Sequence, residues 1–158
     1  TIALESDFDG MGHAVAIAAP DAEGNIIVRV TTHRTIKEAD VQLAKIRREH
    51  PSVYVLVTPG YVDRLKERFD SLVGQREAAA GTQTLLDLFD RRAIKHDGSQ
   101  TLLEHFSSST ISRRQHGWVL SAPMGRSGIY GARAVMFAAS HAMKAPRPIA
   151  MIRTRRRA

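Results

Sequence analysis

Three short apolar runs alternate with polar segments over the first part of the chain. The runs cover residues 2–4, 14–19 and 26–32, and they are rich in Ala, Ile and Val. Between them lie an acidic segment at 5–10 and a segment at 20–25 that holds Pro, Asp, Gly and Asn. Short apolar runs separated by turn-forming residues are typical of strands, and short links favour antiparallel neighbours. The pattern predicts an antiparallel meander of three strands.

A helix and a buried strand are predicted next. Thr35 and Glu38 have the spacing of a capping box, in which each side chain accepts a hydrogen bond from the other residue's backbone. Apolar residues then recur at three- and four-residue steps, namely Ile36, Ala39, Leu43 and Ile46, until Pro51 ends the pattern. Residues 53–57 are continuously apolar, which is typical of a strand covered on both faces. The predicted order is strand, strand, strand, helix, strand.

The remaining chain reads as alternating helical and irregular segments. We expect a helix over 61–69, then an irregular stretch over 70–81 with a short strand at 77–80. Further helices are expected over 84–92 and, from the capping-box spacing of Thr101 and Glu104, over 101–108. A turn is expected at 96–98 and an extended segment at 118–120. Apolar residues from Ile129 to Met143 follow one face of a last helix, which Pro146 ends.

Composition and charge limit the classes of partner that this chain can be expected to bind. The chain has 158 residues, no cysteine and a net charge of +7. This length suits one compact domain, predicted over 1–146 with a basic tail over 147–158. No apolar run reaches the roughly 20 residues that cross a bilayer, so no membrane partner is expected. The excess of Arg and Lys favours a polyanion partner, most simply the backbone of double-stranded DNA, over a merely solvated basic surface.

The first predicted strand ends in three acids, Glu5, Asp7 and Asp9. Carboxylates at the end of a strand are candidate ligands for a hard divalent cation, but a loop that uses Asp and Gly only for its turns explains them equally well. His13 is a candidate ligand or proton shuttle beside these acids, although a polar surface position is the simpler interpretation. The Ser residues at 107–109 lack a Gly-x-Ser-x-Gly motif, so a serine hydrolase is not favoured.

The order of motifs in the second half carries a family resemblance. A Thr-initiated helix over 84–92 is followed by Ile94-Lys95-His96-Asp97-Gly98 and Leu102-Leu103. Arg113-Arg114 precedes Gly117-Trp118, and Gly128-Ile129-Tyr130 opens an Ala-rich segment over 132–139. Together with the strand order and the acids after the first strand, this series resembles the C-terminal nuclease domain of phage terminase large subunits, within the ribonuclease H-like superfamily. The resemblance implies an α/β fold whose mixed sheet, a three-strand antiparallel meander plus parallel strands, is flanked by helices.

The same resemblance implies a nuclease centre and its residues. Three carboxylates from separate elements hold two Mg²⁺ or Mn²⁺ ions in that family. Glu5 matches the first acid, with Asp7 and Asp9 close behind as candidate catalytic and metal-binding residues. Thr58 stands at the second acid position, and Tyr130, beside Ile129, at the third, so the resemblance implies a degenerate acidic site. Three arginines are the candidate contacts to DNA phosphates, namely Arg113, Arg114 and Arg126.

Two functions of different classes follow from these implications. The first is a DNA-packaging terminase nuclease that cleaves concatemeric DNA in the host bacterial cytoplasm. Its expected partners are a packaging ATPase domain of the same longer chain, the portal and the small terminase subunit. The second is a non-catalytic DNA-binding or assembly module that keeps the fold without metal chemistry. Another ribonuclease H-like enzyme, such as a resolvase or an integrase-type transferase, would need the same missing acids.

Overall fold

A six-stranded mixed sheet forms the centre of the computed structural model, which describes residues 1–7, 9–123 and 128–144. The strand order is β5-β4-β1-β2-β3-β6. The strands are β1 (Ile2–Ser6), β2 (His13–Pro20), β3 (Ile26–His33), β4 (Val55–Val57), β5 (Ser71–Leu72) and β6 (Ile94–His96). β1, β2 and β3 pair antiparallel, whereas β4 runs parallel to β1, β5 to β4, and β6 to β3. The predicted meander and the predicted mixed sheet are both confirmed.

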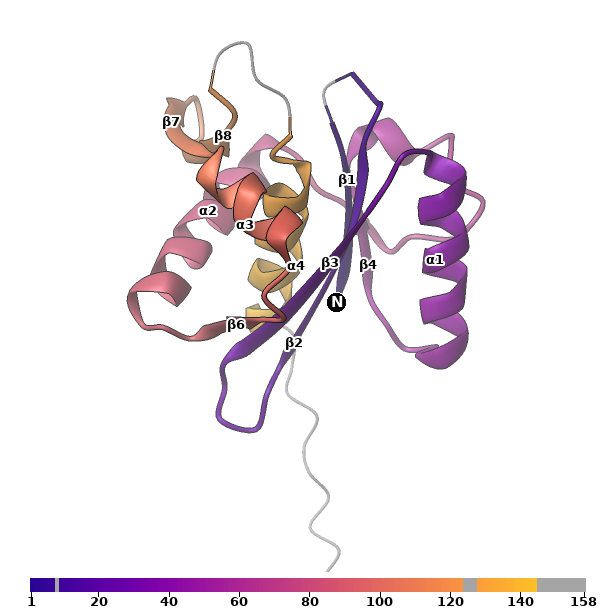
Figure 1. Cartoon of the computed structure of the whole chain (residues 1–158), viewed down its shortest axis with the longest axis horizontal. Helices are drawn as coiled ribbons and strands as arrows, with labels where there is room; N and C mark the ends of the chain where they lie inside the picture. Colours follow the sequence, from indigo (N-terminus) through magenta and orange to yellow (C-terminus); the bar gives the residue numbers. More distant parts are fainter. Residues whose placement is uncertain (8, 124–127, 145–158) are drawn as a thin grey trace, which may run out of the picture.

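Helices cover both faces of this sheet (Figure 1). One face carries α1 (Ile36–Glu49), and the other carries α2 (Gln75–Asp90), α3 (Gln100–Ser107) and α4 (Tyr130–Lys144). A short 3₁₀ helix, η1 (Pro59–Tyr61), follows β4, and a separate hairpin pairs β7 (Thr110–Arg114) with β8 (Gly117–Ser121). No described helix is long and apolar enough to cross a bilayer.

The two faces of the sheet bury two different cores. Ile2 and Leu4 of β1 pack toward Leu43 of α1 in one cluster. Ala3 of β1 belongs to the other cluster, with the small residues of α4. Alternate residues of a strand point to opposite faces, so a strand covered on both sides is apolar throughout. The Ala-rich sequence of α4 lets this helix lie close to the sheet and to α2 at once, and ten of its residues are buried.

Local signals located some elements correctly. The capping box of α1 is confirmed, because Thr35 Oγ1 accepts from the Glu38 N–H at 3.3 Å and Glu38 Oε2 accepts from the Thr35 N–H at 3.3 Å. The last helix and the extended segment around Trp118 are also confirmed, as α4 and β8.

Other predicted elements were wrong. Residues 61–69 form turns after η1 and no long helix, since the Lys66 and Glu67 N–H groups donate to Asp40 of α1. Residues 77–80 are helical and not a strand, because α2 begins nine residues before the predicted Thr84, at Gln75. There the Gly74 N–H donates to Glu77 Oε2 at 2.9 Å.

Three further differences lie in the second half of the chain. α3 begins earlier than the Thr101 spacing suggested, since the Ser99 hydroxyl accepts from the Leu102 N–H. The strands β6 and β7 were not predicted at all. Both are short, and β7 is mostly exposed, so neither carries a clear apolar pattern. The predicted basic tail lies outside the described residues.

Candidate functional site

The strands β1 and β4 end side by side at one edge of the sheet. Their parallel register pairs Leu4 with Val57, so the residues that come next in the chain, Glu5 and Thr58, reach this edge together. The first turns of α4 and the β7–β8 hairpin lie at the same end of the molecule (Figure 1). In open α/β sheets, ligands bind outside the carboxyl ends of the strands. This edge is therefore the candidate functional site.

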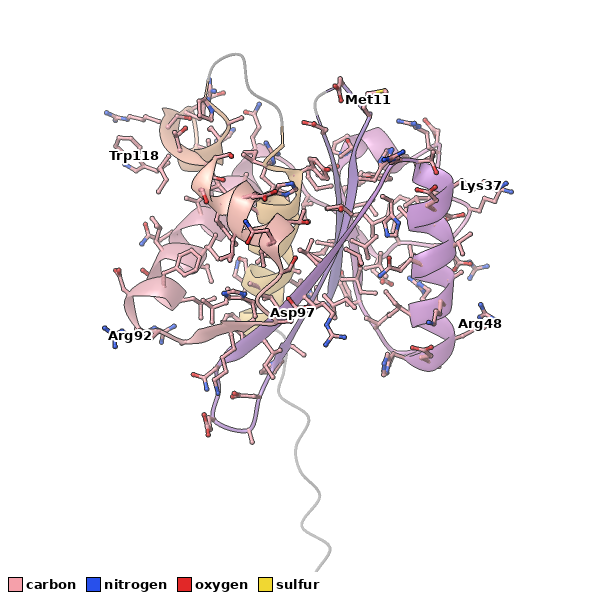
Figure 2. The ribbon with its side chains drawn as sticks, in the orientation of Figure 1. Met11, Lys37, Arg48, Arg92, Asp97 and Trp118 are labelled. Carbon is pink, nitrogen blue, oxygen red and sulfur yellow. The ribbon has the colours of Figure 1, made fainter. Side chains whose placement is uncertain are left out.

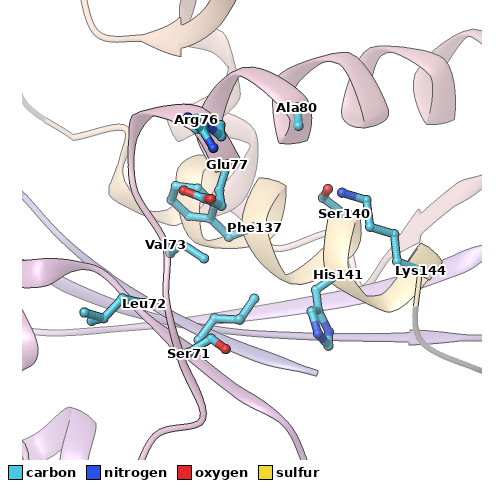
Figure 3. Close-up of a pocket in the computed structure, with 11 residues that line it drawn as sticks. Ser71, Leu72, Val73, Arg76, Glu77, Ala80, Phe137, Ser140, His141 and Lys144 are labelled. Atoms are coloured by element: carbon cyan, nitrogen blue, oxygen red, sulfur yellow. The ribbon is translucent and has the colours of Figure 1, made fainter. Parts of the chain in front are cut away.

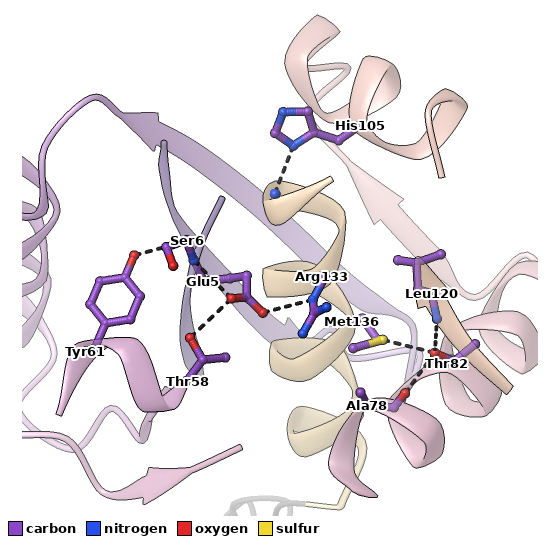
Figure 4. Close-up of polar contacts among 11 residues, drawn as sticks. Glu5, Ser6, Thr58, Tyr61, Ala78, Thr82, His105, Leu120, Arg133 and Met136 are labelled. Atoms are coloured by element: carbon purple, nitrogen blue, oxygen red, sulfur yellow. Dashed lines mark hydrogen bonds and ion pairs between the residues drawn. The ribbon is translucent and has the colours of Figure 1, made fainter. Parts of the chain in front are cut away.

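Both carboxylate oxygens of Glu5 are engaged at this edge (Figure 4). Oε1 accepts from the Ser6 N–H at 3.1 Å and from the Thr58 hydroxyl at 3.2 Å. Oε2 accepts from Arg133 Nε–H at 3.0 Å, which joins β1 to α4. The side chain of Glu5 is 7% exposed and that of Arg133 is 37% exposed. Burial raises the pKa of the Glu5 carboxyl, and the Arg133 charge is the largest effect that opposes the rise.

The Tyr61 hydroxyl connects the backbone of Glu5 to the ring of His13. The Tyr61 hydroxyl donates to the backbone carbonyl of Glu5 at 3.1 Å and lies 2.8 Å from His13 Nδ1. Because the hydroxyl proton goes to Glu5, His13 Nδ1 carries a proton and donates to the Tyr61 oxygen. Burial lowers the pKa of His13, which keeps the ring neutral. The interpretation of His13 as surface is wrong, since it is 1% exposed.

The other two predicted acids have different surroundings. Asp7 Oδ1 accepts from the Gly128 N–H at 3.3 Å, just before α4. Asp9 is exposed, and its Oδ1 accepts from the Met11 N–H at 2.9 Å within the β1–β2 loop. An aspartate that accepts from a backbone N–H two residues ahead forms an Asx turn, the local role considered for these acids from sequence.

Tyr130 and His105 pack tightly around the start of α4. The two rings have centroids 4.6 Å apart. A Cβ at Gly12 would lie 2.7 Å from Tyr130 Cζ, and a Cβ at Gly131 would lie 2.3 Å from His105 Nδ1. His105 Nδ1 accepts from the Gly131 N–H at 2.9 Å, so this nitrogen is unprotonated. Burial lowers the pKa of His105 accordingly. The predicted third acid position thus holds a packed aromatic ring.

The donor set at this edge does not fit a two-ion centre. The described residues form no group of three or more His, Asp or Glu side chains that could hold a metal ion. Glu5 lies beside a Thr hydroxyl and a guanidinium. A guanidinium on the carboxylate takes up a ligand oxygen that Mg²⁺ or Mn²⁺ would need, and it repels a second cation. We therefore assign no metal-dependent step to these residues.

Sequence reasoning missed Arg133. One signal pointed to it, because Arg133 is the only charged residue between positions 129 and 140. A lone cation in an otherwise apolar helix is costly to bury without a partner. That partner is Glu5, 128 residues earlier in the chain.

Two of the three predicted DNA contacts lie on the β7–β8 hairpin. Arg113 and Arg114 are exposed on β7, and neither forms an ion pair with a described residue. Arg113 is paired across the hairpin with Trp118, which is 58% exposed and projects from the surface (Figure 2). Arg126 lies outside the described residues.

A cavity of about 420 Å³ lies apart from this edge, between β5 and the helices α2 and α4 (Figure 3). Its ionisable lining consists of Arg76, Glu77, His141 and Lys144. The one carboxylate, that of Glu77, accepts from the Gly74 N–H and so serves the start of α2. The cavity therefore offers no pair of carboxylates for acid–base or metal chemistry.

Comparisons with solved structures identify the fold. The chain is similar to the HK97 bacteriophage large terminase, with 12% sequence identity and a TM-score of 0.70 over 89% of this chain. The chain spans 38% of the length of that protein.

Two isolated nuclease domains are also similar. The large terminase nuclease domain of Thermus phage P74-26 matches 87% of this chain and 77% of its own length, with 13% identity and a TM-score of 0.57. The large terminase nuclease from a thermophilic phage matches 87% of this chain and 80% of its own length, with 14% identity and the same TM-score of 0.57. No protein-family model and no curated protein matches the chain. The chain has the ribonuclease H-like fold of phage large terminase nuclease domains.

Proposed function

We propose that this chain is the nuclease-type domain of a DNA-packaging terminase, and that it holds double-stranded DNA by its backbone without cleaving it through a two-metal centre. The shared fold supports the first part of the proposal. The observation that carries the second part is the Glu5–Arg133 pair, which puts a fixed cation on the remaining acid of the centre.

The chemistry of phosphodiester cleavage explains why this pair matters. Two metal ions activate the attacking water and stabilise the leaving oxygen, and converging carboxylates must hold both ions. Here Thr58 follows β4, Gly128 and Tyr130 flank Ile129 at the start of α4, and none of these three supplies a carboxylate. With a guanidinium on Glu5 and no carboxylate at these three positions, too few hard oxygen ligands converge to hold two ions. Cleavage by Mg²⁺ or Mn²⁺ at Glu5, Asp7 and Asp9 is therefore the second candidate.

Charge supports DNA as the partner. The chain carries a net charge of +7, and Arg113 and Arg114 are exposed on β7. The hairpin that contains β7 lies at the same end of the molecule as the carboxyl end of β1 (Figure 1). Lys and Arg that neutralise phosphates release counterions, which gives affinity without sequence preference. We further propose that a packaging ATPase domain belongs to the same longer protein. On this proposal the portal and the small terminase subunit are its assembly partners in the host cytoplasm.

The test compares binding with cleavage. The domain is incubated with supercoiled plasmid and Mn²⁺, and its retention of duplex DNA is measured in parallel by gel shift at several salt concentrations. We expect salt-sensitive retention and no nicking. Nicking that disappears in the triple variant Glu5→Ala, Asp7→Ala, Asp9→Ala would establish the cleaving enzyme instead. A wild-type domain that neither retains duplex DNA nor nicks the plasmid would overturn the whole proposal.

A further inference from the structure

Arg133 has more hydrogen-bonding capacity than its contacts use. A guanidinium carries five N–H donors in a planar fork. Nε–H donates to Glu5, and no described residue accepts a hydrogen bond from either Nη group. About a third of the side chain is exposed, 37%, although it lies on a helix that is otherwise mostly buried. The part of Arg133 that faces away from Glu5 is free to bind an anion.

We propose that Arg133, oriented by Glu5, binds a phosphate of the DNA backbone at the place where a two-metal nuclease of this fold holds its ions. This inference rests on the proposed function and assigns a ligand to the same edge. A guanidinium matches the geometry of two phosphate oxygens, and such charge-assisted pairs are short and strong. The fixed cation thus replaces the metal ions in phosphate recognition while supplying no activated water.

The negative charge of Glu5 does not prevent this contact. Glu5 is 7% exposed, and its two oxygens face inward to Ser6, Thr58 and Arg133. A ligand arriving from solvent therefore meets the guanidinium before the carboxylate. Because Glu5 is itself held by Thr58 and Ser6, it fixes the orientation of Arg133 before DNA binds. A preorganised side chain loses less conformational entropy on binding.

The β7–β8 hairpin adds further cations near the proposed phosphate contact of Arg133. The hairpin with Arg113 and Arg114 lies at the same end as the first turns of α4 (Figure 1). A duplex that passes over this edge would meet both the hairpin arginines and Arg133. The two other carboxylates here already accept backbone N–H groups, Asp7 from Gly128 and Asp9 from Met11.

The decisive variant changes both members of the pair, Glu5→Gln with Arg133→Gln. This double substitution leaves the net charge of the protein unchanged, removes the guanidinium and leaves no unpaired buried charge. Affinity for a mixed-sequence duplex is measured by fluorescence anisotropy across a range of salt concentrations. One phosphate contact contributes about 0.9 to the slope of log affinity against log salt, which is about eightfold in affinity at roughly 0.1 M salt.

The expected result is a double variant that binds about eightfold more weakly, with a slope smaller by about 0.9. Arg133→Lys should keep most of the slope, because it keeps a cation. The matched control is Arg48→Gln, which also removes one arginine. Arg48 is exposed in the last turn of α1, at the opposite end of this helix from Lys37 (Figure 2), and its loss should leave the slope unchanged.

Two results separate the possible failures. A double variant that is folded by circular dichroism and binds with wild-type affinity and slope would overturn this inference and leave the proposed function standing. A wild-type domain that binds no duplex even at low salt would overturn the proposed function itself.

Discussion

Replacing Glu5 by alanine should destabilise the domain, because this carboxylate ties β1 to β4 and α4. The substitution leaves the buried Thr58 hydroxyl and the Ser6 N–H without their acceptor. Each lost bond to a charged acceptor costs about 1.5 kcal/mol. Arg133 is partly exposed and can turn to water, so its loss of a partner adds little. Relief from burying the carboxylate offsets about 1 kcal/mol. The net expectation is about 2 kcal/mol of destabilisation.

Urea unfolding followed by circular dichroism measures this difference as a shift of the midpoint at constant slope. In a thermal scan of a domain of this size, a loss of about 2 kcal/mol lowers the melting temperature by roughly 4–8 °C. The control is Asp9→Ala, which removes an exposed carboxylate from the β1–β2 loop and should change stability by less than about 0.5 kcal/mol.

The pH dependence provides a second check on the same variant. Burial raises the pKa of Glu5 in the folded state above its ordinary value of 4.5. Between 4.5 and the raised value, the folded protein binds the proton more tightly than the unfolded chain. The wild type should therefore gain stability relative to Glu5→Ala as the pH falls toward 4.5. Equal or higher stability of Glu5→Ala at neutral pH would refute the structural role of the carboxylate.

Two further predictions concern buried polar groups elsewhere. The Thr82 hydroxyl accepts from the Leu120 N–H at 2.9 Å and joins α2 to β8. Thr82→Val should therefore lower the free energy of unfolding, measured in urea, by about 1–3 kcal/mol. The control Thr84→Val removes only a hydrogen bond within α2 and should lower it by less. Burial lowers the pKa of His105, so the unfolded state binds more protons below pH 6.5 and stability should fall as the pH drops through this range. His105→Gln should reduce that dependence, and an unchanged pH profile would contradict the assignment.

The sequence by itself determined the elements whose signals are local. Apolar runs separated by turn residues located β1, β2 and β3, because a short strand and its turns are encoded within a few residues. The Thr35–Glu38 box located the start of α1 for the same reason. The family resemblance placed Glu5 and Thr58 at the ends of two strands, and the parallel pairing of β1 with β4 in the structure brings these two ends to the same edge.

Elements whose signals come from packing were decided only by the tertiary structure. The first half of α2 has small residues where a helix normally shows large apolar ones, because Gly81 lies against Met136 of α4. Residues 61–69 follow a pattern compatible with a helix, but Asp40 of α1 captures two of their N–H groups. A contact between distant segments can override local propensity, and no local pattern reveals it.

The site shows the same division. The sequence located one acid, Glu5, and showed that Thr58 stands where a second would be expected. The cation that neutralises Glu5 comes from α4, and the ring that supports it comes from η1, each far away in the chain. Burial lowers the pKa of His13 and keeps its ring neutral, whereas the guanidinium of Arg133 is paired with Glu5 and is partly exposed to solvent. Only the folded chain brings these groups together, and their proximity determines the chemistry of this edge.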